Sequence, residues 1–264
     1  MKRGASTIFR CKEKDLEMIE VGRGQGILAD YQPWLYVHQE RGDCTSLRFY
    51  LPLTGRTHQL LTRKNIQCFM ELIFDDTVTD IREYYALLPR DETIEMAEAA
   101  GIKFPRYSES HDKKVLTFDF VVSRGDEVTA VVVHTGKTLN DITERRIFQI
   151  QQLYCNKHGW KLQVEYKENM SAQRANNIRR IMMPSPWGPE EYGAEAREEF
   201  LEMYFQSDLS IREIAGKVEA NNGLEKGMGI HLFRTLMREK QILLNLDAGP
   251  MIYSTKGEIR WRRL

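Results

Sequence analysis

The sequence predicts an α/β domain, in which helices flank a mixed sheet, followed by a small α+β domain. An apolar hairpin, "LTFDFVVSRGDEVTAVVVHTGK" at 116–137, precedes a long helical segment and another strand, an order typical of such a sheet. A cluster of prolines and turn formers, "MMPSPWGPEEYG", separates this part from the rest. Three helical segments and two extended ones follow, which is the order of a winged-helix domain. We therefore place the two domains at 1–170 and 171–264.

The spacing of apolar residues predicts the first elements. Leu47, Phe49 and Leu51 alternate as in a half-buried strand that ends in the turn at Thr54-Gly55. In "LLTRKNIQCFMELIFDD" the apolar residues recur at helical spacing, which predicts an amphipathic helix.

The next elements are marked by capping and breaking residues. "DIREYYALLP" predicts an extended segment closed by Pro89. A short helix follows, with Asp91 as its N-cap and Gly101 just past its end. After the hairpin, a second long helix is expected from Asn140 to His158, stopped by Gly159 and leading to the strand "KLQVEYK".

The second domain is predicted from its segment order. The helices are expected in "EAREEFLEMYFQ", "SIREIAGKV" and "GIHLFRTLMREKQ", with Ser210 and Glu213 forming a capping box. "ILLNLD" and "MIYSTKGEIRWRR" are expected to form the terminal hairpin, or wing.

Composition limits the class of protein. With 42% apolar and 29% charged residues, the 264-residue chain is ordinary for a globular protein. Lys plus Arg and Asp plus Glu number 38 each, so any nucleic-acid binding must come from local patches. No apolar run approaches the roughly 20 residues that span a bilayer, and the charged start is not a secretory signal, so we expect a cytoplasmic protein without membrane contact. The scattered cysteines, Cys11, Cys44, Cys68 and Cys155, indicate reduced thiols and no zinc site.

Asp119 and His134 pose the main chemical question. Many metal-dependent nucleases carry a carboxylate and then a lysine on two neighbouring strands, and here the second strand supplies His134 in place of the lysine. On a regular strand, the Asp119 side chain would point away from both Phe118 and Phe120. It could there hold Mg²⁺ as a hard oxygen ligand, or it could be an acid on a solvated face.

Two other charged or glycine-rich stretches have a chemical and a structural interpretation. "GRGQG" at 22–26 could cradle a phosphate with its backbone N–H groups, or it could be a flexible entry to the sheet. "DIRE", with Asp80, Arg82 and Glu83, is interpreted as a mixed-charge strand edge.

Basic residues of the second domain could contact DNA. His231, Arg234, Arg238 and Lys240 lie along the candidate recognition helix, and a cluster around Trp261 consists of Arg260, Arg262 and Arg263. Such side chains can bind phosphates, but they can equally be the solvated face of a helix, and a winged helix can also dock on a protein.

Five stretches occur together in one order: "GRGQGILADYQPWL", "TGRTHQLL", "DIREYYALLP", "GIKFP" and "TFDFVV". Together they resemble the motifs of the TnsA family, the endonuclease subunits of the heteromeric transposases of Tn-seven-like elements, across about the first 170 residues. The resemblance implies a restriction-endonuclease-like mixed sheet flanked by helices, followed by a small winged-helix-like α+β domain. It also implies Mg²⁺-dependent cleavage at the 5′ ends of a transposon, beside a TnsB-like transposase and a TnsC-like AAA+ ATPase.

The family's site residues map onto this chain only in part. The family glutamate falls on Asn65, the aspartate is retained as Asp119, and the glutamine and lysine of the next strand are Val132 and His134. The candidate catalytic positions are thus Asp119, Asn65 and His134, with Asp119 as the metal ligand. The candidate DNA contacts are Arg23, Arg56, His58, Arg234, Arg238 and Arg262.

These replacements favour a TnsA-like subunit that acts at transposon ends with impaired cleavage. Asparagine brings no negative charge to a metal, and histidine is a weaker permanent cation than lysine. Two alternatives remain open at this point: an active Mg²⁺-dependent endonuclease with a rearranged site, and a DNA-binding regulator that uses the winged helix.

Overall fold

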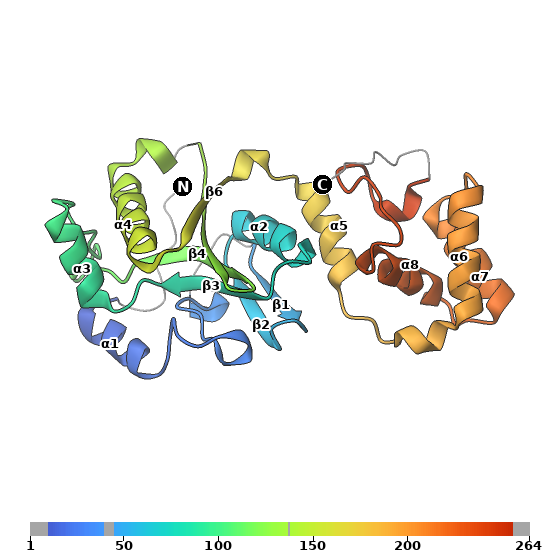
Figure 1. Cartoon of the computed structure of the whole chain (residues 1–264), viewed down its shortest axis with the longest axis horizontal. Coiled ribbons are helices and arrows are strands. Elements are labelled where there is room, and N and C mark those ends of the chain that lie inside the picture. Colours follow the sequence, from blue (N-terminus) through green and yellow to red (C-terminus); the bar gives the residue numbers. More distant parts are fainter. Residues whose placement is uncertain (1–9, 40–44, 137, 256–264) are drawn as a thin grey trace. The chain divides into compact units, whose positions relative to one another are not determined.

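The computed structural model describes residues 10–39, 45–136 and 138–255, and the chain divides into two compact units, 1–170 and 171–264. Figure 1 shows the sheet and its helices in the first unit and a bundle of helices in the second. Each unit is described by itself.

The first unit is built on a four-stranded mixed sheet. Its strands are β3 (Asp80–Ala86), β4 (Thr117–Arg124), β5 (Glu127–His134) and β6 (Lys161–Tyr166), in the spatial order β3-β4-β5-β6. The first three are antiparallel, and β6 runs parallel to β5 because α4 carries the chain across between them. A separate antiparallel pair consists of β1 (Leu47–Leu51) and β2 (Arg56–Leu60).

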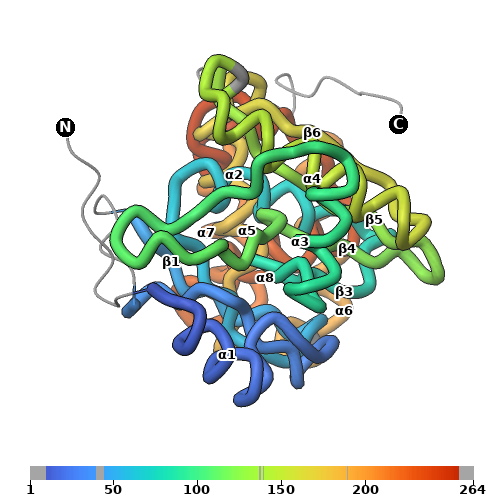
Figure 2. Tube along the Cα trace, turned by 90° about the vertical axis from the view of Figure 1, so that its left-hand side faces the viewer, coloured from blue at the N-terminus to red at the C-terminus, as the bar shows by residue number. Residues whose placement is uncertain are grey.

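Helices cover both faces of this sheet. Figures 1 and 2 show α1 (Lys12–Glu20) and α4 (Ile142–His158) on opposite sides of it. On one face, α4 and α3 (Arg90–Ala99) share a buried cluster with Phe118 and Val132 of the sheet. On the other, α2 (Arg63–Phe74) places Phe69 against Phe120, with ring centroids 6.2 Å apart. The single-turn 3-10 helices of this unit are Leu28–Asp30, Val37–Gln39, Thr138–Asn140 and Lys167–Asn169.

Local signals set the helix ends. The Asp141 carboxylate accepts hydrogen bonds from the N–H groups of Thr143 and Glu144 at 2.7 and 3.2 Å, and Gly159 ends α4 with a φ of 68°. The predicted N-cap of α3 is wrong by two residues, because the helix begins at Arg90 after Pro89, and the Asp91 side chain caps nothing there. Pro89 fits just before a helix, where a missing N–H costs no intrahelical bond.

The glycine motif at 22–26 serves packing. A Cβ on Gly24, whose φ is +71°, would lie 2.5 Å from the Cβ of Ala86 on β3. The N–H groups of Gly22, Gly24 and Gln25 donate to carbonyls of neighbouring residues at 3.0, 2.7 and 3.2 Å. These N–H groups are therefore committed within the fold, which argues against the phosphate-cradle interpretation.

The second unit is helical throughout the part that the structure describes. It contains α5 (Ala172–Met182), α6 (Ala194–Gln206), α7 (Ile211–Asn222) and α8 (Met228–Arg238), with 3-10 turns at Pro189–Tyr192 and Met251–Tyr253. The last three helices and the Ser210–Glu213 capping box were predicted, whereas α5, which lies just before the proline-rich stretch, was not.

The predicted first wing strand is absent from residues 239–255. The N–H groups of Gln241 and Ile242 donate to the Leu236 carbonyl at the end of α8, at 2.9 and 3.3 Å, and not to a strand partner, while Ile242 and Leu246 are buried in the helical core. The Asn177 side chain of α5 donates to the carbonyls of Leu246 and Gly249 at 2.9 and 3.3 Å, which satisfies groups that a strand partner would otherwise satisfy. The rest of the proposed wing, 256–264, lies outside the described residues.

Helix α8, the candidate recognition helix, is a core element. Each residue from Met228 to Arg238 is buried or partly buried, and none is exposed. The loop before α6 covers part of it, since the Trp187 ring lies edge-on to His231 with centroids 4.7 Å apart. A helix packed in this way does not present a free face to a DNA groove, so the recognition-helix interpretation is not supported.

The described ranges contain free cysteines and no candidate membrane-spanning helix. Cys11, Cys68 and Cys155 are free thiols, and Cys44 lies outside those ranges. Among the residues searched, no helix is both long and apolar enough to cross a bilayer.

Candidate functional site

The sheet and α2 bring Asp119 and Asn65 into direct contact. The Asn65 amide Nδ2 donates to Asp119 Oδ1 at 2.7 Å, and the backbone N–H of Val133 donates to Oδ2 at 2.7 Å. Asn65, the position to which the resemblance assigns the family glutamate, therefore contacts Asp119 across 54 residues of sequence. Both carboxylate oxygens of Asp119 accept hydrogen bonds from the protein.

Lys64 is the functional residue that the sequence analysis missed. Its ammonium Nζ lies 3.6 Å from Asp119 Oδ1, and it donates a hydrogen bond to the carbonyl of Val133. The cation beside Asp119 is therefore supplied by α2 and not by β5. A lysine immediately before Asn65 was the available signal, but its contact with a distant strand could not be read from local spacing.

Thr62 fixes the orientation of the Asn65 amide. The Thr62 hydroxyl caps α2 by accepting from the Asn65 N–H at 3.3 Å, and it donates to Asn65 Oδ1. The carbonyl end of the amide is thereby engaged by Thr62, so the NH₂ end faces Asp119. Asn65 thus meets the carboxylate as a hydrogen-bond donor.

Strand β4 departs from simple alternation at Asp119. Phe118 packs against Tyr154 of α4, with ring centroids 6.0 Å apart, whereas Phe120 packs on the α2 side. The expectation that Asp119 points away from both aromatics is therefore wrong. Opposite it, the β3–β4 pairs run on both sides of Tyr84 but skip Tyr84 itself, which has a left-handed φ of 49°. This irregularity lets the carboxylate reach Asn65.

His134 does not take the place of the missing lysine beside Asp119. Its side chain is 7% exposed, and its ring packs edge-on against Phe148 of α4 and Tyr166, at centroid distances of 5.3 and 6.3 Å. Nδ1 is buried without a hydrogen-bond partner. Burial, reinforced by the charge of Lys64, lowers the pKa of His134, so the imidazole is neutral near pH 7.

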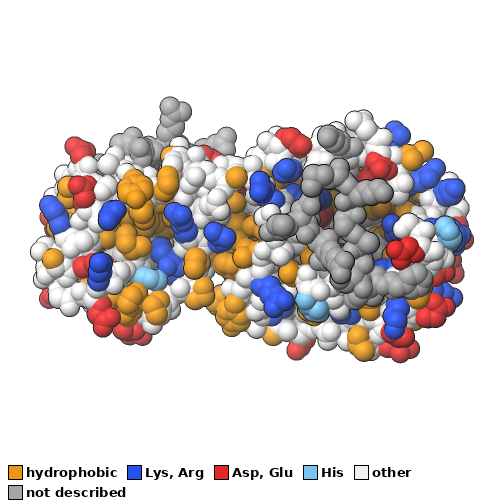
Figure 3. Space-filling view, turned by 180° about the vertical axis from the view of Figure 1, so that it is seen from behind, with side chains coloured by type: hydrophobic (Ala, Val, Ile, Leu, Met, Phe, Trp, Pro, Cys, Tyr) orange, Lys and Arg blue, Asp and Glu red, His pale blue; other side chains and the backbone are white. Residues whose placement is uncertain are grey.

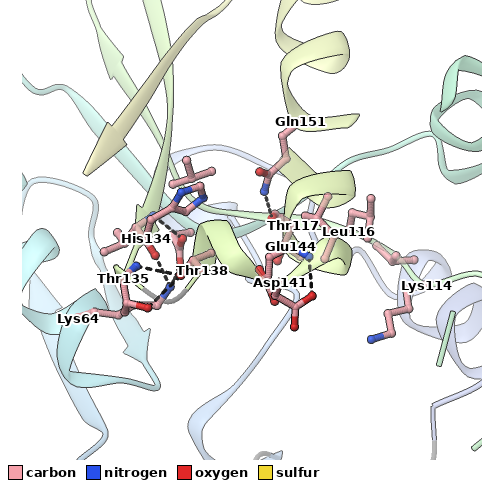
Figure 4. A pocket seen from close by; sticks show the side chains of 15 residues that line it. Lys64, Lys114, Leu116, Thr117, His134, Thr135, Thr138, Asp141, Glu144 and Gln151 are labelled. Carbon is pink, nitrogen blue, oxygen red and sulfur yellow. Dashed lines mark hydrogen bonds and ion pairs between the residues drawn. The ribbon is translucent and has the colours of Figure 1, made fainter. Parts of the chain in front are cut away.

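A cavity of about 480 Å³ opens beside these residues (Figure 4). Lys64, His134, Thr135 and Thr138 lie on one side of the close-up, and Lys114, Asp141 and Glu144 lie on the other. The lining contains two lysines against three acids, Asp119, Asp141 and Glu144. The cavity is therefore not an electropositive pocket of the kind that captures phosphate by charge alone.

The donors at Asp119 do not fit a divalent metal ion. Mg²⁺ requires several oxygen ligands around it, and here Asp119 is met by an amide NH₂, a backbone N–H and an ammonium. For Asn65 to offer its carbonyl, the amide would have to turn over and lose the hydrogen bond from Thr62. No group of three or more His, Cys, Asp or Glu residues suited to a metal is found among the described residues.

Arg56 and His58, two candidate DNA contacts, are directed into the fold. They are 8% and 0% exposed, and both bind the Glu83 carboxylate, which is fully buried on β3. Neither side chain could reach a phosphate without breaking these bonds, so we reassign both to a structural role. The "DIRE" stretch lies on β3, an edge strand of the four-stranded sheet, but Asp80, Arg82 and Glu83 are all buried and do not form an exposed charged edge.

The remaining candidate DNA contacts are partly engaged within the protein. Arg23 donates to the carbonyls of Pro33 and Trp34 at 3.2 and 3.1 Å. Arg234 donates to the Met183 carbonyl, and Arg238 to the Thr235 hydroxyl at 2.9 Å. Arg262 lies outside the described residues. On the face shown in Figure 3, Lys and Arg side chains are dispersed among hydrophobic and uncharged ones. DNA contact by Arg23, Arg234 and Arg238 therefore stays a prediction.

The first unit thus combines a mixed sheet flanked by helices with an acid on a hairpin strand and a helical residue turned toward it. This arrangement is consistent with a restriction-endonuclease-like fold. No protein-family model matches the chain. It is 37% identical over 145 residues to the transposon Tn7 transposition protein TnsA of Escherichia coli.

This similarity makes the chain a TnsA-like protein. The match covers 51% of this chain and 52% of the Escherichia coli protein, so the chain spans about half the length of the curated relative it matches.

Proposed function

We propose that the chain is a TnsA-like subunit of a Tn7-like DNA transposition complex that acts at transposon ends without efficient 5′-strand cleavage. In this role it would bind end DNA beside a TnsB-type transposase and connect to a TnsC-type ATPase, as the family resemblance implies. What supports a transposition role is the similarity to TnsA. What supports impaired cleavage is the hydrogen bond from Asn65 Nδ2 to Asp119 Oδ1.

Strand cleavage depends on the charges that surround the scissile phosphate. Metal-assisted hydrolysis needs acids that hold the ion and a cation that stabilises developing negative charge. In this chain one acid is replaced by an amide that donates to the other, and His134 is neutral and packed against α4. Loss of a single charge-stabilising group costs about 10²–10³ in rate, so losing both a carboxylate and a lysine would leave little cleavage.

Strand-specific nicking tests the proposal. The full chain, combined with a TnsB-type transposase and a TnsC-type ATPase, is incubated with Mg²⁺ and DNA that carries the element's end and a label on each strand. We expect 3′-end processing by the transposase and no 5′-end nick. A matched variant carrying Asn65→Glu and His134→Lys serves as the comparison, because it restores the charges that the family positions carry. Specific 5′ nicking by the unchanged chain that disappears in Asp119→Ala would refute impaired cleavage.

The transposition role is tested separately by assembly. Retention of the chain on end-containing DNA by the transposase, compared with DNA of scrambled end sequence, is the expected result. Failure to join the transposase and the ATPase on such DNA would refute the role in the complex, whatever the nicking assay shows.

A further inference from the structure

We propose that Lys64 is a built-in cation that replaces a divalent metal ion at Asp119, so that this site is held together without metal. This role of Lys64 stabilises the first unit and does not rest on the transposition role. Its evidence is the position of the Lys64 ammonium and the donors that surround the Asp119 carboxylate.

The Asp119 carboxylate needs a positive neighbour. Its side chain is 20% exposed, and a partly buried charge is costly unless it is paired and hydrogen-bonded. A metallonuclease supplies that charge from solution as a metal ion. Here Lys64 supplies it from α2, with Nζ 3.6 Å from Oδ1.

The surrounding contacts hold Lys64 in place. Its ammonium donates to the carbonyl of Val133, the residue whose own N–H donates to Asp119 Oδ2. Asn65, the next residue on α2, donates to Oδ1. The side chain is thus anchored to β5 on the same backbone unit that binds the carboxylate, which distinguishes it from a mobile surface lysine.

A divalent ion at Asp119 would therefore meet a like charge and not a vacant coordination position. Before an ion could bind, the Lys64 ammonium would have to leave and the Asn65 amide would have to turn over. Both requirements oppose metal binding, since the ammonium and the metal ion are both positive and repel each other, and an amide NH₂ cannot ligate a metal ion.

Reversing the charge of Lys64 tests whether its ammonium takes the place of a metal ion. In Lys64→Glu the built-in cation becomes a second acid beside Asp119, so a cation from solution should now stabilise the fold. Thermal unfolding of the full chain is followed in EDTA and in millimolar MnCl₂. We expect the melting temperature of the unchanged protein to be the same in both, whereas that of Lys64→Glu falls in EDTA and recovers by about 3 °C or more with Mn²⁺.

The control is Lys14→Glu on α1. Lys14 also pairs with an acid on its own helix, Glu17 at 2.6 Å, but both side chains are more than half exposed. Reversal there should give no comparable Mn²⁺ response, since exposed charges are screened by solvent. Stabilisation of the unchanged protein by Mn²⁺ that is lost in Asp119→Asn would overturn the proposal, as would a Lys64→Glu protein indifferent to Mn²⁺.

A neutral variant keeps the proposal testable if Lys64→Glu does not fold. Lys64→Gln should melt below the matched Lys14→Gln in EDTA, and the difference should vanish in an Asp119→Asn background because the partner charge is then gone. Equal melting of Lys64→Gln and Lys14→Gln would overturn the proposal. These readouts are independent of DNA cleavage, so this inference and the proposed function can fail separately.

Discussion

Glu83→Gln tests how strongly a buried charge cluster holds the first unit together. The Glu83 carboxylate accepts from both Arg56 terminal nitrogens at 2.9 and 2.7 Å, from His58 Nδ1 at 2.8 Å and from the Gln59 N–H at 2.9 Å. Burial by itself raises the pKa of Glu83, but His58 and Arg56 outweigh it and lower the pKa to about 2. The substitution keeps the shape and removes the charge.

The stability that the Glu83 charge contributes follows from its pKa. A fall from 4.5 to about 2, at about 1.4 kcal/mol per unit, corresponds to about 3 kcal/mol of stability. Because the folded pKa is depressed, this contribution is fully present above pH 4.5 and is lost as the pH falls toward 2. Glu83→Gln also leaves Arg56 buried without its counter-charge, a situation that costs about 3–5 kcal/mol.

The assay compares urea unfolding of the unchanged protein and Glu83→Gln from pH 7 down to pH 3. Hydrogen exchange at the Gln59 amide gives a local measure, since this N–H donates to the carboxylate. The difference in unfolding free energy should shrink as the pH drops below 4.5. Burial raises the pKa of Asp15, which therefore contributes with the opposite sign, and taking the difference between the two proteins removes that contribution. A difference below about 1 kcal/mol at pH 7, or one independent of pH, would refute the reasoning.

Three further outcomes are expected. Gly24→Ala should lower the free energy of unfolding in urea by about 2–4 kcal/mol, because the alanine would have a left-handed φ and clash with Ala86. Gly125→Ala, at a φ of +59° but facing open space, should lower it by only about 1–2 kcal/mol. Equal losses would contradict a packing role for Gly24. A variant with Lys64→Gln and Asn65→Glu, which removes the built-in cation and replaces the donor amide by an acid, should bind Mn²⁺ by calorimetry through Asp119, and heat that persists without Asp119 would place the metal elsewhere. Ser210→Ala should lower unfolding free energy by about 1 kcal/mol, since it removes the cap of α7.

Elements with strong local signals were predictable from the sequence. The long helix α4 has a capping aspartate at its start and a left-handed glycine at its end, and the β4–β5 hairpin has apolar strands around a Gly125 turn. These features depend on residues a few positions apart. The second unit's last three helices were predicted for the same reason, whereas its wing was not found between 239 and 255 because Asn177 and the helical core satisfy that segment instead.

The parts that were missed depend on contacts between distant segments. Lys64 meets Asp119 across 55 positions, and Arg56 meets Glu83 across 27, so neither pairing has a local spacing that would reveal it. Asp119 was a candidate because it lies on an apolar hairpin strand, whereas Asn65 could be proposed only because of the family resemblance. The donor role of the Asn65 amide depends on Thr62 and could not be inferred from residue identity.

Two charged clusters of the first unit have different roles. The three residues of the Arg56–His58–Glu83 cluster are buried and pair with one another, so they stabilise the fold without an ion from solution. The Asp119 group lies at a cavity, where a metallonuclease would depend on an ion from solution, but here its charge is compensated by Lys64 and Asn65. Removing divalent ions should therefore leave the stability of the unchanged protein intact, whereas Glu83→Gln should lower it. A protein of this kind can keep a nuclease-like fold without the metal chemistry, because the charge of Asp119 is compensated from within the chain.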